Sequence, residues 1–265
     1  MKEKYAVFDL GQMVNIPGRT PIGLVIIFRP EALFKVGVLR EILETISSEG
    51  FSILYFALSQ PKPLTPLTSF FVIDATEKLK DVQKLAKKIK KCGDVAKVEV
   101  IEPLFDSLLI NTYFDALYVA GERSVIFRKT LYQALIKIVR EFFGTGGGAL
   151  LYHMGTVIGR QAFESHKEIA GEYLDRLIKI SEALFKAFGF GKAEILEVDV
   201  KNGKARVRVW NSFECELFKQ AGEPSSHFVR GIWSGWFQAL FKREVRSVEV
   251  KCIAKGDEYC EFRIF

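Results

Sequence analysis

The chain has few of the residues and motifs that usually mark an enzyme or a secreted protein. Its 265 residues include only three histidines and four cysteines. There is no dinucleotide-binding glycine fingerprint and no Ser-His-Asp order. No apolar run approaches membrane-spanning length, and the first residues lack the apolar core and cleavage site of a signal peptide. These absences favour a cytoplasmic binding protein over an enzyme, with cysteines that serve as thiols or metal ligands.

Positive charge is also not gathered into one region. The net charge is +6, and it is spread over both halves of the chain. The one lysine-rich segment, residues 78–91, has apolar residues at helical spacing, so its lysines cover the solvated face of a helix. This distribution does not favour a nucleic-acid partner.

Phenylalanine is abundant instead. The chain has 23 phenylalanines, and 49% of its residues are apolar. Such a surplus suggests a cavity lined with rings, and a ring-rich core explains it equally well. A chain of this length is comfortable with two domains, each able to bury a core.

The N-terminal part alternates between strand and helix patterns. The expected order is strand, helix, strand, strand, helix, strand, at residues 22–28, 37–48, 51–58, 69–73, 78–91 and 95–101. With short, right-handed connections this order predicts a ferredoxin-like βαββαβ domain, in which an antiparallel sheet carries both helices on one face.

One segment of this part, VGVLREILETISSEGFSIL, closely resembles the first helix of an ACT domain and the strand after it. ACT domains bind amino acids or other small effectors and usually pair their sheets side by side. The usual acidic residue before the helix is missing here, where Phe34, Lys35 and Val36 precede Gly37. The resemblance therefore implies an ACT-like regulatory or dimerisation domain, which we expect over residues 1–105.

The C-terminal part reads as helices followed by strands and a further helix. Helices are expected at residues 130–143, 149–164, 169–188 and 228–241, with a hairpin between residues 194–200 and 205–210. The glycine-rich run at residues 144–148 is expected to end the first helix, because no Lys-Ser/Thr pair follows it as in a phosphate loop. Gly231 and Gly235 are four residues apart, a spacing that suits close backbone packing.

The last residues predict a second hairpin that holds potential metal ligands. Glu249, Cys252 and Cys260 have the spacing E-x2-C-x7-C, and Cys252 falls near the end of one strand while Cys260 starts its partner. The two sulfurs are therefore expected to converge on one metal ion or on each other. With a histidine upstream, this hairpin suggests a zinc site.

Four separated blocks of the C-terminal part resemble, in order, those of the 4-vinyl reductase domain. The blocks are LLYHMGTVIGRQ, VRVWNSFECELF, HFVRGIWSGWFQALF and VEVKCIAKGDEYCEFRIF. This family is also described as hydrocarbon-binding, is similar in fold to TRAPP-type vesicle-tethering subunits, and includes sensor domains for phenols. The resemblance implies an α+β ligand-binding domain over residues 106–265.

The resemblance also implies a ligand set for a structural zinc ion. The hairpin donors match as Glu249, Cys252 and Cys260. The remaining donor falls nearest His227, or at Ser226 if the spacing is kept strictly, and Cys215 is a competing choice. The alternative is a metal-free pair of core thiols.

A pocket for an apolar or aromatic ligand follows from the same resemblance. The residues expected to line it are Tyr152, His153, Phe163, Trp210, Phe213, Trp233, Trp236 and Phe237. The protein is then predicted to be a homodimeric small-molecule sensor in which ligand binding biases the dimer. The alternatives are an enzyme or accessory protein in tetrapyrrole vinyl reduction and a protein-interaction scaffold.

Overall fold

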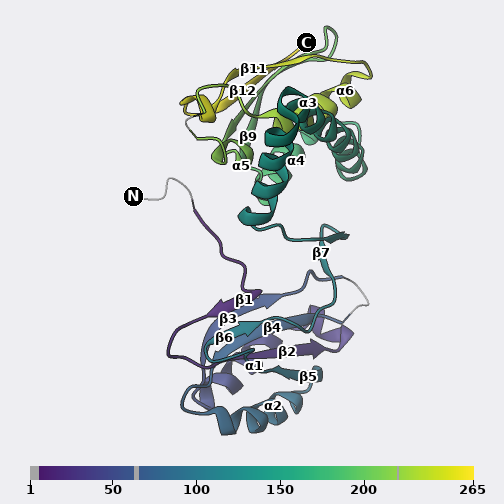
Figure 1. The fold of residues 1–265 in the computed structure, drawn as a ribbon. Helices are drawn as coiled ribbons and strands as arrows, with labels where there is room; N and C mark the ends of the chain where they lie inside the picture. Colours follow the sequence, from purple (N-terminus) through teal and green to yellow (C-terminus); the bar gives the residue numbers. More distant parts are fainter. Residues whose placement is uncertain (1–5, 63–65, 220) are drawn as a thin grey trace. The chain divides into compact units, whose positions relative to one another are not determined.

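The protein is described here by a computed structural model that covers residues 6–62, 66–219 and 221–265. Its internal contacts divide the chain into two compact units, Met1–Val125 and Ile126–Phe265 (Figure 1). This division lies further along the chain than the boundary after residue 105 that the sequence predicts. The overall class is α+β, as predicted.

The N-terminal unit has the predicted βαββαβ order. Its elements are β2 (Pro21–Phe28), α1 (Val38–Ser48), β3 (Ser52–Leu58), β4 (Thr68–Asp74), α2 (Val82–Lys90) and β5 (Val95–Ile101). The strands form an antiparallel sheet in the order β3-β4-β2-β5. The apolar stripes of both helices, represented by Ile42 and Leu85, pack with Leu24 and Phe71 in one core. Both helices therefore cover the same face of the sheet, which gives the ferredoxin-like, ACT-like fold.

Residues beyond position 105 complete this unit. Strand β6 (Leu108–Ile110) pairs with β1 (Met13–Asn15), and Leu109 packs with Val25 and Phe70 on the sheet face opposite the helices. A small hairpin follows, formed by β7 (Leu117–Val119) and β8 (Glu122–Ser124). The contacts of Leu109 explain why the N-terminal unit extends past the expected boundary.

The described residues of the C-terminal unit combine helices with a second antiparallel sheet. The helices are α3 (Lys129–Ala170), α4 (Leu174–Ala187), α5 (Phe213–Glu216) and α6 (His227–Phe241). The strands are β9 (Lys192–Asp199), β10 (Lys204–Trp210), β11 (Ser247–Lys251) and β12 (Cys260–Ile264), in the order β11-β12-β10-β9. Both predicted hairpins, β9 with β10 and β11 with β12, are confirmed.

The glycine-rich run bends a helix rather than ending it. Helix α3 is continuous through residues 144–148 except at Gly144, whose φ of 51° and ψ of −125° form a kink. The prediction of two separate helices here was wrong. The chain resumes its helix because the following turns pack on α6, where glycine is required for close approach.

The crossing of α3 and α6 is built on glycines from both helices. A Cβ atom at Gly155 or Gly159 would overlap the backbone of α6, and one at Gly231 or Gly235 would overlap the backbone of α3. This confirms the close packing predicted for Gly231 and Gly235. On its other side α6 packs against the sheet, where Trp233 shares a core with Val207, Val209 and Phe262. Helix α6 is therefore buried between α3 and the sheet.

No helix in the described parts of the chain combines the length and the apolar character that crossing a membrane requires.

Candidate metal centre and aromatic interior

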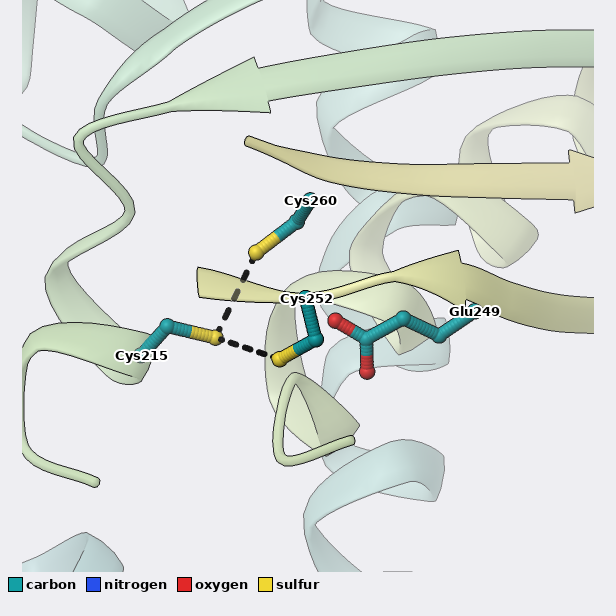
Figure 2. Close-up of side chains that lie close together, drawn as sticks. All are labelled: Cys215, Glu249, Cys252 and Cys260. Atoms are coloured by element: carbon teal, nitrogen blue, oxygen red, sulfur yellow. Dashed lines mark hydrogen bonds between the residues drawn. The ribbon is translucent and has the colours of Figure 1, made fainter. Parts of the chain in front are cut away.

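Four potential metal ligands converge in the C-terminal unit. They are Cys215 of α5, Glu249 of β11, Cys252 just after β11, and Cys260 at the start of β12, and one donor atom from each lies within 4.8 Å of the others. Figure 2 shows the three sulfurs facing one another and the Glu249 carboxylate beside Cys252. The Sγ of Cys215 lies 3.5 Å from that of Cys252 and 3.4 Å from that of Cys260. These separations are far longer than a disulfide bond, so the thiols are free.

The local fold explains why the two hairpin cysteines meet. After Cys252 the chain forms a short 3-10 helix at Ile253–Lys255 and turns at Gly256, whose φ is 110°. The backbone N–H of Cys252 donates to Asp257 Oδ2 at 2.8 Å, which closes this turn. The turn returns Cys260 beside Cys252, and α5 brings Cys215 to them from the end of β10.

Backbone N–H groups surround the cluster. Ser225 N–H donates to Cys252 Sγ and Ile253 N–H donates to Cys260 Sγ, each at 3.4 Å. Ser226 holds the carboxylate of Glu249 through its backbone N–H at 3.1 Å and its hydroxyl at 2.7 Å. Hydrogen bonds of this kind orient metal ligands and favour their deprotonated forms.

The acid–base properties of the cluster reflect its burial. Burial raises the pKa of Glu249 to about 8, with the neighbouring Cys252 as the next cause. Hydrogen bonds from the Cys215 and Cys260 thiols hold the pKa of Cys252 below its usual range, whereas the bond to Cys252 raises the pKa of Cys215. Without a cation, the four groups cannot all carry charge, because like charges so close together repel.

The donor set fits a zinc ion. Structural zinc takes four protein donors in a tetrahedron, with thiolate the preferred type, and a Zn–S bond of about 2.3 Å places the sulfurs about 3.8 Å apart. The observed separations of 3.4 and 3.5 Å need only small adjustments. Cys215, Glu249, Cys252 and Cys260 would be the ligands, and such an ion would supply the positive charge that the buried donors lack.

His227 does not join this group, although the sequence favoured it as the remaining donor. It is the first residue of α6, and its ring faces Gly148 of α3, close to the position of a Cβ there. Its pKa is lowered by burial and by Arg140. The turn of the helix separates it from Ser226, whose hydroxyl lies 2.8 Å from Cys215 Sγ. The structure thus brings Cys215, the competing choice, to the hairpin donors.

Most of the expected pocket residues lie in a packed aromatic interior. Phe163, Trp233, Trp236 and Phe237 are buried, and ring centroids are 5.3 Å apart for Phe163 and Trp236 and 4.9 Å apart for Trp236 and Phe237. Half-buried Phe213 lies at the edge of this group, 5.2 Å from Phe190. These rings fill one another's spaces as a core does.

The other three expected pocket residues lie elsewhere in the unit. Trp210 packs against Tyr259, with ring centroids 5.5 Å apart, and its strand alternation directs it away from buried Val209. Tyr152 and His153 line a separate cavity between α3, α6 and β11.

Two residues of this interior lie outside the set expected from the sequence. His166 accepts a hydrogen bond at Nδ1 from Trp236 Nε1–H at 3.2 Å, and burial lowers its pKa. Its helical spacing from Gly159 and Phe163 marks the buried face of α3, a signal that was hidden because the helix was expected to end at residue 164. Glu214 accepts hydrogen bonds from the backbone N–H groups of Phe228 and Val229 at 2.9 and 2.8 Å, which satisfies the start of α6. Burial raises its pKa to about 7.

Comparisons with known proteins agree with this architecture. Residues 205–265 match the family model of the 4-vinyl reductase domain. An uncharacterized protein of Methanocaldococcus jannaschii is 34% identical over 125 residues, which are 46% of this chain and 66% of that relative. The chain therefore spans just under two thirds of the length of that relative.

Two solved structures resemble the two units. The phenol-responsive sensory domain of the transcription activator PoxR, solved with phenol, superposes with a TM-score of 0.51 at 19% identity, covering 56% of this chain and 79% of that one. An ACT domain from a GTP pyrophosphokinase of Chlorobium tepidum has a TM-score of 0.26 at 20% identity, covering 31% of this chain and 99% of that one. The chain is a 4-vinyl reductase domain protein with an ACT-like N-terminal unit.

Proposed function

We propose that this protein is a cytoplasmic small-molecule sensor whose 4-vinyl reductase domain binds an aromatic ligand that carries a hydroxyl group. The observation that carries the proposal is the indole N–H of Trp233, which is buried among rings and has no hydrogen-bond partner in the described part of the chain. Leaving such a donor unpaired costs about 1–3 kcal/mol, so a site of this kind is expected to have a use. The fold shared with the phenol-responsive domain of PoxR supports the same ligand class.

The ligand would enter from the less buried side of the ring cluster. Trp233 lies 5.2 Å from Phe185, which in turn lies 5.3 Å from half-buried Phe190. Outward movement of Phe190 and Phe213 would open space beside the indole N–H, which would then donate to the ligand oxygen. The surrounding rings would provide offset and edge contacts to an aromatic ring.

The proposed zinc ion would have a structural role. Three cysteines and a glutamate leave no open coordination position for water or substrate. The ion would tie the β11–β12 hairpin to α5, next to Glu214 and the start of α6. Three buried free thiols persist in a reducing compartment, which supports the cytoplasmic location.

Titration with phenol and toluene tests the ligand class, because the two probes are similar in size and only phenol has a hydroxyl. We expect phenol to bind about tenfold more tightly, as one net hydrogen bond predicts, in calorimetry or tryptophan fluorescence. The Trp233→Phe variant should lose this preference, whereas the matched Trp236→Phe variant should keep it. An unchanged preference in Trp233→Phe, or no binding of either probe to the wild type, would rule the proposal out.

We further propose that the sensor is a homodimer joined along α3. Leu131, Leu135, Ile138 and Phe142 are exposed and follow one another at intervals of four, three and four residues, the spacing of a helix-pairing seam. Packing this face against the same face of a second copy would remove it from water, and a ligand that changes the packing of α3 would then change the dimer.

Sedimentation velocity at micromolar concentration tests the dimer. The wild type is expected to sediment as a dimer, and Leu135→Glu should shift it to monomer because the seam would contain a buried charge. The control Lys201→Glu, in the exposed turn between β9 and β10, should leave the dimer intact. A monomeric wild type would contradict this part of the proposal.

A further inference from the structure

A cavity of about 670 Å³ lies in the C-terminal unit between α3, α6 and the start of β11. Tyr152, Thr156 and Arg160 line it from α3, Arg230 and Gln238 from α6, and Arg246 from the segment before β11. Neither the proposed zinc ligands nor the interior aromatic rings line it. Its volume lies within the range of small-molecule sites. It is therefore a second candidate site with its own chemistry.

The charge of this cavity is mainly positive. Three arginines line it against one carboxylate, that of Glu244. Arg160 and Arg246 are exposed, and within the described residues their guanidinium groups have neither an ion pair nor a hydrogen bond. A planar guanidinium group binds a carboxylate or phosphate through two parallel hydrogen bonds. Two such groups at one cavity are suited to an anion.

The third arginine is held in place by its neighbours. Arg230 donates from Nη1 to the backbone oxygen of Ser247 at 2.9 Å, and its guanidinium carbon lies 4.7 Å from the centroid of the Tyr152 ring. These contacts fix the side chain at the wall of the cavity without neutralising its charge. A charge that is held in place before binding loses less conformational freedom when a ligand arrives.

An unsatisfied acceptor marks the interior side of the cavity. Gln238 is 8% exposed, and its Oε1 has no hydrogen-bond partner among the described residues. Its Nε2 donates to Glu244 Oε2 at 3.0 Å, which fixes the orientation of the amide because a carboxylate only accepts. Buried side-chain oxygens are usually paired, so this one requires a donor from outside the chain.

We infer that this cavity binds a small organic anion that carries a hydroxyl group. Its carboxylate or phosphate oxygens accept hydrogen bonds from Arg160 and Arg246, while Arg230 adds positive charge at the wall. The ligand hydroxyl donates to Gln238 Oε1. This inference is independent of the aromatic ligand and of the zinc ion, since it uses none of their residues.

NMR titration of the full chain at low ionic strength tests the inference. The probes are inorganic phosphate, glycerol 3-phosphate, glycerate and the neutral control glycerol, all without rings that could enter the aromatic interior. The three anions are expected to shift amide signals around the cavity, and glycerol is not. Glycerol 3-phosphate should bind more tightly than inorganic phosphate because it can donate to Gln238. Comparison of glycerate with glycerol 3-phosphate identifies whether carboxylate or phosphate is preferred.

Variants separate the contributions. The double variant Arg160→Gln with Arg246→Gln should weaken binding of glycerol 3-phosphate by about tenfold or more, because each charged hydrogen bond accounts for about that factor. Gln238→Leu should remove the preference for glycerol 3-phosphate over inorganic phosphate. Lys186→Gln, in the exposed last turn of α4, changes charge without touching the cavity and should have no effect. Equal binding by the double variant, or equal shifts with glycerol, would overturn the inference.

Discussion

Replacing Gly159 with alanine is expected to lower the free energy of unfolding by about 3 kcal/mol or more, among the larger effects of a single substitution. The added Cβ would overlap the carbonyl oxygen of Ile232 and lie 2.8 Å from the backbone nitrogen of Trp236. Both atoms belong to the backbone of α6, so no side chain can rotate away to make room. Relief requires that α3 and α6 separate along their crossing, which would loosen the aromatic interior.

Chemical denaturation of the wild type and the variant measures this effect. Gly146→Ala is the matched control, because a Cβ there has no atom within 4 Å and Gly146 lies in the same helix. It should be neutral or stabilising by up to about 1 kcal/mol, since alanine favours helix more than glycine does. If Gly159→Ala were as stable as Gly146→Ala, the close approach of the two helices would be wrong.

Replacing Cys252 with serine is expected to abolish zinc binding. The wild type should retain about one zinc ion per chain, since four donors form one tetrahedral site. The variant keeps the size of the side chain but loses a thiolate from the centre of the cluster. Zinc at about a thousandfold above its dissociation constant stabilises a protein by about 4 kcal/mol, so the melting temperature should also fall.

Metal analysis and thermal unfolding with and without a chelator measure both effects. A chelator should lower the melting temperature of the wild type to that of Cys252→Ser, and it should not affect the variant. Cys92→Ser, a thiol of the N-terminal unit, is the control and should retain zinc. Affinity should weaken as the pH falls below 8, because binding must displace the proton that Glu249 holds with a pKa of about 8. Equal zinc content in Cys252→Ser and the wild type would exclude this site.

Much of the fold was predictable because local patterns and the final packing agree. Strand β2 is apolar throughout and lies at the centre of its sheet, and the stripe of α2 meets the core while its lysines remain outside. The spacing from Cys252 to Cys260 predicted their convergence, because a hairpin that short can only return to its starting point. The glycine pair of α6 likewise indicated a close helix contact.

The failures share a different cause. The run at residues 144–148 contains the residues that usually end a helix, yet α3 continues through it, since contacts with α6 outweigh the local preference of glycine. The position of Leu109 in the N-terminal core depends on a pairing with β1 that spans most of that unit. Neither contact leaves a local pattern in the sequence.

The sequence by itself determined the two kinds of fold, their order along the chain and the thiol-bearing hairpin, because these follow from periodicity and turns within short segments. Only the tertiary structure decided between Cys215 and His227 as neighbours of that hairpin. Both precede or begin the same region of the chain, and which side chain meets the sulfurs depends on the direction in which α5 and α6 leave the sheet. The same packing turned the expected aromatic cavity into interlocked rings and left the cationic cavity beside α6 open, because side-chain volumes fill space only once the helices are in place.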